Sequence, residues 1–556
     1  MLIDARQLDD GAELTADLVV VGAGIAGISI VDRLRTSGLS ICLIEAGGFT
    51  PELRTQRLYR GESVGAPYFR LDACRFRQFG GSCNHWGGAS WPLTPIDFDR
   101  REWLPWSGWP ADYADFERYF ADAAEVLELP SSHFDSAAWP AGMPPPLDMS
   151  QSSFENAIVR YSPVTALGIT HRDRVRAAKD VTTLLYGNAT ELILGPDDRR
   201  IEAVLVRTLG GRSCRVHGRT VVLAAGGIEN ARLLLASRGR RPAGVGNEND
   251  LVGRFFMEHL HVPAGHLAVH PGPIERDFYR KAAYDGARVR GLLTPTPEAQ
   301  ARHRLLGCSI AIEEPSYTYG TPFDGWPPAV TTVPYWTYSR LQRGGHRRAA
   351  GKVQGGLDHA WNASRRLETW RLTRAARSRD SAASGPRPKQ VFSLYVRAEQ
   401  APDPASRISL SESKDELGLP RARLDWRVSD YDTGSIEAWL DEFDADVRRR
   451  SIGHVIKAPE GWADMIRGGP HHMGTTRMSL DPRTGVVDGN CRVHSVDNLY
   501  VAGSSVFTTS GHVNPTFTLV ALTLRLADEL RRSLGGREEP STVDVFDSRT
   551  DGVLDR

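Results

Sequence analysis

The sequence predicts an α/β fold, and three observations in its first 45 residues carry that prediction. Residues 17–21 form an apolar, β-branched run that is typical of a buried parallel strand. Glycines at 22, 24 and 27 follow, and a helical pattern over residues 28–37 ends at Gly38. A second strand is expected over residues 40–44, directly before Glu45. Strand, helix and strand in this order make one βαβ unit, which requires a parallel sheet.

The three glycines have the spacing of a dinucleotide-binding fingerprint. Glycine permits a tight turn and a close approach of the pyrophosphate, and the helix N-terminus offers unpaired N–H groups. Glu45 lies 23 residues after Gly22, where a carboxylate can accept from the adenosine ribose hydroxyls and disfavours a 2′-phosphate. We therefore predict a bound dinucleotide other than NADP, and this motif does not separate FAD from NAD.

Length and composition limit the classes of function. A chain of 556 residues is too long for one hydrophobic core, so two domains are expected. Lys+Arg and Asp+Glu both number 68, which gives no electrostatic reason to expect nucleic acid or an acidic membrane as partner. Six scattered cysteines without CxxC spacing favour reduced thiols in a cytoplasmic protein. We see neither a signal peptide nor an apolar run near the roughly 20 residues of a membrane span.

Further elements are predicted along the chain. Single strands are expected over 181–194, 220–225, 391–397 and 406–410, and two strands within 486–501. Helices are expected over 229–237, 434–450 and 516–534. The Arg-rich stretch 340–390 is predicted to be a solvated insertion, with a homo-oligomer or partner contact as the alternative.

Three more glycine-containing segments are candidates for contact with the cofactor. Residues 80–88 read Gly-Gly-Ser-Cys-Asn-His-Trp-Gly-Gly and would let the backbone approach a flat ring, with a buried structural turn as the alternative. A strand meets a helix through Gly226 and Gly227, and an apolar strand ends in the small residues 502–505. Neither of these last two segments is diagnostic alone.

Two loops near the C-terminus carry the predicted chemistry. His471 and His472 precede a Gly-Thr pair, and Asn514, 43 residues after His471, precedes a proline. Oxidation of an alcohol carbon requires its hydroxyl proton to leave, and a neutral imidazole suits that task near pH 7. A carboxamide beside it can hold the oxygen without competing for the proton. A metal site from His471, His472 and His512 is the alternative, but no carboxylate has ligand-like spacing, so no metal is expected.

With these motifs the chain resembles the glucose–methanol–choline (GMC) family of flavoprotein oxidoreductases. The resemblance covers the N-terminal fingerprint, residues 220–227 and nearly all of residues 470–530. In the family the catalytic histidine lies four residues before the Thr of a Gly-Thr pair, which corresponds to His471. The second catalytic position is His or Asn, often before Pro, which corresponds to Asn514. Within the family the chain resembles the pyranose-oxidase-like branch, which carries Gly-Gly-X-X-X-His-Trp, matched here by residues 80–86. In some members of that branch this histidine is covalently bonded to the flavin, so the resemblance makes His85 a candidate for covalent attachment.

The resemblance implies an FAD-binding Rossmann-like domain and a discontinuous substrate domain built on an antiparallel sheet with covering helices. The FAD-binding domain is expected from residues 14–100, 176–262 and 466–540, and the substrate domain from 101–175 and 263–465. Substrate contacts are expected at His471, His472 and Asn514. FAD contacts are expected at Gly22, Gly24, Ile25, Ala26, Gly27, Glu45, Ala46, Gly80, Gly81, Ser82, Asn84, His85, Trp86, Gly87, Ala189, Ala225, Gly226, Gly503, Ser504, Asn514 and Thr516.

The resemblance also implies FAD-dependent oxidation of a primary or secondary alcohol of a sugar, glycoside or similar polyol. His471 would take the hydroxyl proton, hydride would pass to flavin N5, and oxygen or another oxidant would accept the electrons. Similarity to FAD dehydrogenases of aminoglycoside and other sugar biosynthesis favours a sugar, as do 13 Trp and 15 Tyr, whose faces suit sugar rings. The alternatives are oxidation of a non-sugar alcohol, a non-redox lyase on the same fold, a nicotinamide enzyme and a non-catalytic flavin-binding protein.

Overall fold

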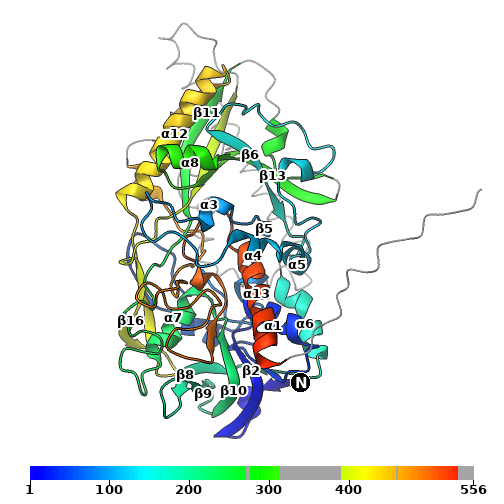
Figure 1. Cartoon of the computed structure of the whole chain (residues 1–556), viewed down its shortest axis with the longest axis vertical. Helices are drawn as coiled ribbons and strands as arrows, with labels where there is room; N and C mark the ends of the chain where they lie inside the picture. Colours follow the sequence, from blue (N-terminus) through cyan, green and yellow to red (C-terminus); the bar gives the residue numbers. More distant parts are fainter. Residues whose placement is uncertain (165, 271–275, 285, 314–389, 459–460, 536–556) are drawn as a thin grey trace, which may run out of the picture.

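The protein is described by a computed structural model that covers residues 1–164, 166–270, 276–284, 286–313, 390–458 and 461–535. Figure 1 shows an elongated molecule with a largely parallel sheet at its lower end and an antiparallel sheet at its upper end. The predicted Arg-rich insertion, 340–390, lies outside the described residues except for its last residue.

The first sheet has eight strands and contains the predicted βαβ unit. Its order is β1 (Leu2–Asp4), β7 (Val181–Leu185), β3 (Ile41–Ile44), β2 (Ala12–Val21), β10 (Ser213–Leu223), β9 (Ile201–Arg207) and β8 (Asn188–Leu194), with β19 (Leu499–Val501) paired to β10. The pairs from β1 to β10 and the β10–β19 pair are parallel, whereas β8 and β9 form an antiparallel extension. The α/β class predicted from the βαβ unit is therefore confirmed.

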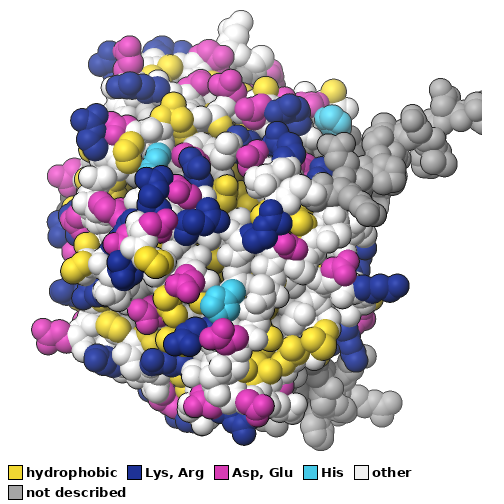
Figure 2. Space-filling model, turned by 60° about the horizontal axis from the view of Figure 1, so that its bottom comes forward, with side chains coloured by type: hydrophobic (Ala, Val, Ile, Leu, Met, Phe, Trp, Pro, Cys, Tyr) yellow, Lys and Arg dark blue, Asp and Glu magenta, His cyan; other side chains and the backbone are white. Residues whose placement is uncertain are grey.

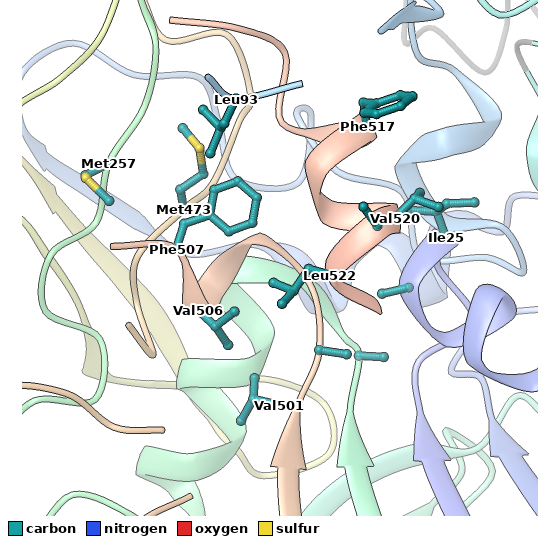
Figure 3. Close-up of a cluster of buried hydrophobic side chains, with 14 of the residues drawn as sticks. Ile25, Leu93, Met257, Met473, Val501, Val506, Phe507, Phe517, Val520 and Leu522 are labelled. Carbon is teal, nitrogen blue, oxygen red and sulfur yellow. The ribbon is translucent and has the colours of Figure 1, made fainter. Parts of the chain in front are cut away.

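Two helices pack together on this sheet. Helix α1 (Ile25–Leu34) begins earlier than predicted, because Gly24 is already its N-cap. Helix α13 (Thr516–Leu534) has the predicted bounds and packs against α1. Figure 3 shows Ile25 of α1 facing Phe517 and Val520 of α13, all of them buried. Each such side chain contributes roughly 1.5–3 kcal/mol when fully buried, so this contact fixes the N-terminal unit to the C-terminal helix.

The second sheet is antiparallel and also has eight strands. Its order is β18 (Gly453–Lys457), β11 (Leu260–Val269), β15 (Gln390–Ala398), β14 (Cys308–Glu313), β13 (Ala287–Pro295), β6 (Phe154–Tyr161) and β5 (Ala89–Ser90), with β12 (Ala282–Tyr284) paired to β13. Helices α12 (Asp430–Arg449) and α8 (Pro297–His303) lie beside it at the upper end of Figure 1. A capping box between Ser429 and Asp432 starts α12, which covers the predicted helix at 434–450 except for its last residue.

A small third sheet joins β16 (Arg407–Lys414), β17 (Pro420–Trp426) and β4 (Glu62–Gly65). The predicted strands at 391–397 and 406–410 lie in β15 and β16. Most strands of the antiparallel sheet come from the segments predicted for the substrate domain, whereas β5 and the start of β11 come from the segments predicted to bind FAD. The division into two discontinuous domains stays a prediction.

Two of the predicted strand assignments are wrong. Residues 181–194 are not one strand but two, β7 and β8, because Tyr186 adopts φ 59° and turns the chain before Gly187. Residues 486–501 contain one strand, β19, rather than two; Val487 makes only isolated bridges with Met478 and Val493. Val486, Val487, Val493 and Val496 are buried, but they lie in turns and isolated bridges and not in a continuous ladder.

The face of the surface drawn in Figure 2 mixes basic and acidic side chains without a broad area of one sign. That mixture agrees with the equal numbers of Lys+Arg and Asp+Glu. Among the helices that the structure describes, none combines the length and the apolar character needed to cross a membrane.

A buried ion pair between Arg101 and Glu399 yields a test of the fold. The two side chains are 1% and 0% exposed, and Arg101 Nη1 donates to Glu399 Oε2 at 2.8 Å. Glu399→Gln should lower the free energy of unfolding by about 3–5 kcal/mol, because it removes the hydrogen-bonded counter-charge of a buried guanidinium. Urea-induced unfolding measures this change. Asp497→Asn, which breaks an exposed pair with Arg199, is the control and should leave the midpoint unchanged.

Candidate active site

The C-terminal ends of four parallel strands bring the predicted cofactor segments together. β2, β3, β10 and β19 are followed by the glycine fingerprint, by Glu45 and Ala46, by Ala225 and Gly226, and by the 502–505 turn, respectively. Ligands of open α/β sheets bind at this edge, outside the carboxyl ends of the strands.

The fingerprint turn is tightly packed at its glycines. Gly22 adopts φ +105°, and a Cβ there would lie 2.7 Å from the carbonyl oxygen of Ala224. A Cβ on Gly27 would lie 1.9 Å from the carbonyl oxygen of Gly22. Gly24 is the N-cap of α1 and offers no side-chain cap, so no N-cap side chain occupies the first amides of the helix. The turn is therefore closed tightly on its own backbone, and the amides at the start of α1 are the kind of donors that a dinucleotide pyrophosphate requires.

Glu45 is 6% exposed and serves the turn as well as the predicted ribose contact. Its carboxylate accepts from the backbone N–H of Ala23 at 3.0 Å and of Gly47 at 2.8 Å. Burial raises the pKa of Glu45 above its usual value. A carboxylate has about four acceptor positions, so acceptor capacity remains for a hydroxyl donor. Ala189, another predicted contact, lies in β8 opposite Val206.

The segment at 80–88 packs directly on the fingerprint. The N–H of Gly80 donates to the carbonyl of Ala23 at 2.7 Å, and a Cβ on Gly81 would lie 3.3 Å from Gly24 Cα. Asn84 ties this loop down, because its Nδ2 donates to Phe79 O at 2.7 Å and its Oδ1 accepts from Gly168 N at 2.9 Å. Both polar groups of the Asn84 side chain thus have protein partners.

His85 lies in the same loop, next to Phe76. The two ring centroids are 4.2 Å apart, and His85 Nε2 is 3.3 Å from Gln78 Nε2. The Ser82 hydroxyl accepts from the Phe76 N–H at 3.4 Å, and the Trp86 indole donates to the carbonyl of residue 164 at 3.1 Å. A Cβ on residue 87 would meet nothing within 4 Å, so this glycine borders open space.

Asn230 joins the turns that follow β10 and β19. Its side chain accepts from Ala225 N at 2.8 Å and donates to Ala502 O at 3.3 Å and Ser505 Oγ at 3.1 Å. The Ser504 hydroxyl in turn donates to the carbonyl of His472 at 2.8 Å. The Thr475 hydroxyl of the same loop donates to the carbonyl of Gly227, beside the turn after β10. The loop with the two histidines is therefore docked onto both turns.

His471 and Asn514 lie side by side. Asn514 Nδ2 is 3.5 Å from His471 Nε2, and Arg397 Nη1 donates to Asn514 Oδ1 at 2.7 Å. On the other side of the ring, His471 Nδ1 is 2.8 Å from His259 Nδ1. Burial, with smaller contributions from His259 and His261, holds the pKa of His471 well below its usual value, so the ring is neutral near pH 7.

His472 and His512 face other groups. His472 Nε2 lies 3.9 Å from a Glu258 oxygen and 3.9 Å from Cys74 Sγ, and burial lowers its pKa to about 3. His512 Nε2 is 3.0 Å from Thr294 Oγ1, and burial lowers its pKa to about 4. Thr516, a further predicted contact, is the first residue of α13. Within the described residues, no group of three or more His, Cys, Asp and Glu side chains is suited to hold a metal ion.

The sequence reasoning missed Glu258, which holds the backbone of the loop that contains His471. Its carboxylate accepts from the backbone N–H groups of His471 at 3.0 Å, Gly469 at 2.9 Å and His259 at 3.2 Å, and from the Tyr68 hydroxyl. Burial raises the pKa of Glu258 to about 7.

His259, His261, Tyr395 and Arg397 were missed as well. His261 Nδ1 is 2.8 Å from the Tyr395 hydroxyl, and both residues belong to paired strands of the antiparallel sheet. The available signal was Glu258, His259 and His261 interrupting the apolar run from 255 to 264. Buried polar residues in such a run require partners, and partners of this kind cluster at functional sites.

Comparisons with known proteins agree with this arrangement. Residues 402–523 match the family model described as GMC oxidoreductase. The chain is 24% identical to the fructose dehydrogenase large subunit of Gluconobacter japonicus, over 94% of this chain and 98% of that protein. It is 26% identical to paromamine 6'-oxidase of Streptomyces fradiae, over 94% and 92%. The fold is similar to the crystal structure of pyridoxine 4-oxidase from Mesorbium loti, with a TM-score of 0.51, 18% identity, and coverage of 92% and 98%.

These matches, together with the glycine turns at the sheet edge, show that the chain resembles GMC oxidoreductases over nearly its whole length and matches their family model at residues 402–523. It is accordingly an enzyme that acts on CH–OH groups, with a small-molecule substrate and an oxidant that accepts the electrons. FAD is the cofactor that this resemblance supports, and the start of α1, where Gly24 offers no capping side chain, fits it.

The packing at Gly27 leads to a prediction on cofactor retention. Gly27→Ala would force the turn open, because the new Cβ would lie 1.9 Å from the backbone oxygen of Gly22. The purified variant should therefore hold less than a tenth of the flavin of the wild-type protein, as measured by the ratio of visible to 280 nm absorbance. Gly434→Ala is the control, since a Cβ there meets nothing within 4 Å. Full flavin content in Gly27→Ala would contradict this account of the turn.

Proposed function

We propose that this enzyme oxidises a primary or secondary alcohol of a sugar, glycoside or similar polyol, with FAD as cofactor and His471 as base. The observation that carries the proposal is the pair formed by His471 Nε2 and Asn514 Nδ2, 3.5 Å apart. A neutral imidazole and a carboxamide at this separation can contact one hydroxyl group together.

The proposed roles of the pair follow from their hydrogen-bonding partners. Arg397 can only donate, so Asn514 presents Oδ1 to it and turns Nδ2 toward His471. Asn514 Nδ2–H would then donate to the substrate oxygen while His471 Nε2 takes the hydroxyl proton. The chemistry that FAD supplies when bound is acceptance of the carbinol hydride at N5.

The predicted FAD contacts and the two-domain division are part of the same proposal. The fingerprint glycines, Glu45 and the segments at 80–87, 225–226 and 503–504 would hold FAD at the edge of the parallel sheet. His261, Tyr395 and Arg397, from β11 and β15, would face the substrate from the antiparallel sheet. Reaction would then occur between the two sheets, where cofactor and substrate sites commonly meet.

A sugar or polyol is supported by two relatives that align over nearly the whole chain. One is named fructose dehydrogenase large subunit and the other paromamine 6'-oxidase, so both act on sugars or aminosugars. The polar groups of His261, Tyr395 and Arg397 add donors and acceptors that suit several hydroxyl groups at once.

Anaerobic mixing with a panel of compounds tests the substrate class. Sugars, glycosides or cyclitols should bleach the flavin absorbance, whereas simple alcohols of two to four carbons should do so at least tenfold more slowly. Stopped-flow absorbance near the visible maximum of the flavin measures both. If only non-sugar alcohols reduce the flavin, the substrate class is wrong. If no alcohol does so, the non-redox alternative gains support.

His471→Ala tests the base. The variant should keep its FAD but show flavin reduction slowed on the order of 10²–10⁴-fold, because a general base contributes about that factor. His217→Ala is the matched control, since His217 lies in the first half of β10 and contacts Glu202 and Glu13. Equal reduction rates in wild type and His471→Ala would rule out the assigned role.

His85 remains our candidate for covalent attachment of the flavin. The loop that contains His85 packs on the fingerprint, because a Cβ on Gly81 would lie 3.3 Å from Gly24 Cα. Acid precipitation of the wild-type protein should leave yellow flavin in the pellet, and His85→Ala should release it into the supernatant. If the flavin of the wild-type protein appears in the supernatant, covalent attachment through His85 is ruled out. Non-covalent binding of FAD would still be consistent with that result.

A further inference from the structure

A second histidine, His259, lies against the side of His471 that faces away from Asn514. The two Nδ1 atoms are 2.8 Å apart, the ring centroids are 4.9 Å apart, and the rings are inclined at 73°. His259 Nε2 is 3.1 Å from the backbone carbonyl oxygen of Ser510. His259 is 0% exposed, so water does not compete for either of its nitrogens.

The carbonyl of Ser510 decides which nitrogen of His259 carries the proton. A carbonyl oxygen can only accept, so His259 Nε2 must be the donor in the 3.1 Å contact. Burial lowers the pKa of His259 to about 3, and a neutral imidazole has a single N–H. His259 Nδ1 is therefore an acceptor, and the hydrogen in the 2.8 Å contact belongs to His471 Nδ1.

Arg397 sets the direction of hydrogen bonding from the other end. Its Nη1 donates to Asn514 Oδ1 at 2.7 Å, so Asn514 turns its Nδ2–H toward His471 Nε2. Both neighbours of His471 thus require the same tautomer: a hydrogen on Nδ1 and a lone pair on Nε2. The donor direction is unbroken from the guanidinium of Arg397 to the carbonyl of Ser510.

We propose that His259 is a positioning residue that holds His471 in the tautomer whose Nε2 lone pair faces the substrate. This inference rests on the proposed function, because the tautomer matters only if His471 is the base. Without an acceptor at the position of His259 Nδ1, a neutral His471 can also carry its hydrogen on Nε2, and that form cannot take a proton there. His259 itself does not contact the reacting atoms.

Two substitutions separate the acceptor from the bulk of the side chain. His259→Leu removes the acceptor and should slow anaerobic flavin reduction roughly 10- to 100-fold, the cost known for losing a partner that orients a metal-ligating histidine. In His259→Asn, Oδ1 occupies about the position of the imidazole Nδ1 and can still accept from His471. The rate in His259→Asn should return to within about threefold of wild type, although the bond to Ser510 is lost. Flavin content and thermal unfolding of each variant monitor folding.

A chemically fixed tautomer of His471 separates a positioning role of His259 from a structural one. If His259 were only structural, fixing the tautomer would not change the rate of flavin reduction. Replacement of His471 by Nδ1-methylhistidine leaves the lone pair on Nε2 permanently, but the methyl group would clash with His259 at 2.8 Å. Combined with His259→Gly, which makes room for the methyl group, this replacement should restore flavin reduction on the order of tenfold over His259→Gly alone. Methylation in the presence of His259 should instead impair the enzyme.

The outcomes distinguish this inference from the proposed function. If His471→Ala does not slow flavin reduction, the proposed function fails first. If His471→Ala is slow but His259→Leu reacts like wild type, only the inference is overturned. Equal loss in His259→Leu and His259→Asn, with no rescue by methylhistidine, would assign His259 a purely structural role and also overturn it. Should His259→Leu lose its flavin, the comparison of His259→Gly with and without methylhistidine decides.

Discussion

The parallel pairing of β2 with β10 is the constraint on which the site depends. Their register runs from Ala12 opposite Cys214 to Val21 opposite Leu223, so both strands end at the same level. The turns that follow therefore touch, and Gly22 must lack a side chain because Ala224 is already there. Since the last residues of β10 also pair with β19, the 502–505 turn is brought to the same edge. A slip of this register by one residue would separate all three turns.

The buried polar groups behind the histidine loop form a second layer of organisation. Glu258 is 0% exposed and uses its carboxylate to accept from three backbone N–H groups and one hydroxyl. Burying a carboxylate is costly unless such donors surround it, and here the donors belong to the loop that carries His471. The backbone of that loop is therefore held in place by a residue from the start of the antiparallel sheet, more than 200 positions earlier.

The fold was predictable where the local pattern had one physical interpretation. The β-branched run before the fingerprint and the amphipathic segment at 516–534 were both identified correctly, because strand and helix periodicities are plain there. The predictions failed at 181–194, where a left-handed residue at Tyr186 divides the segment, and at 486–501, where buried valines lie in turns. Apolar composition reports burial in both cases, but it does not report how the backbone hydrogen bonds are paired.

The sequence by itself determined the glycine fingerprint, the acidic residue after the second strand, and the histidine and asparagine that carry the proposed chemistry. The fingerprint and the acidic residue lie within one short segment, where spacing reflects the geometry of a turn and a helix start. The histidine and the asparagine lie 43 residues apart, and their roles come from the resemblance to the GMC family. Only the tertiary structure decided which groups surround His471. His259, Arg397 and Glu258 lie 212, 74 and 213 positions before His471 in the chain. Arg397 acts on His471 only through Asn514. Hydrogen-bond direction, and with it the tautomer of a buried histidine, depends on which donors and acceptors folding brings within about 3 Å, and no local pattern encodes that.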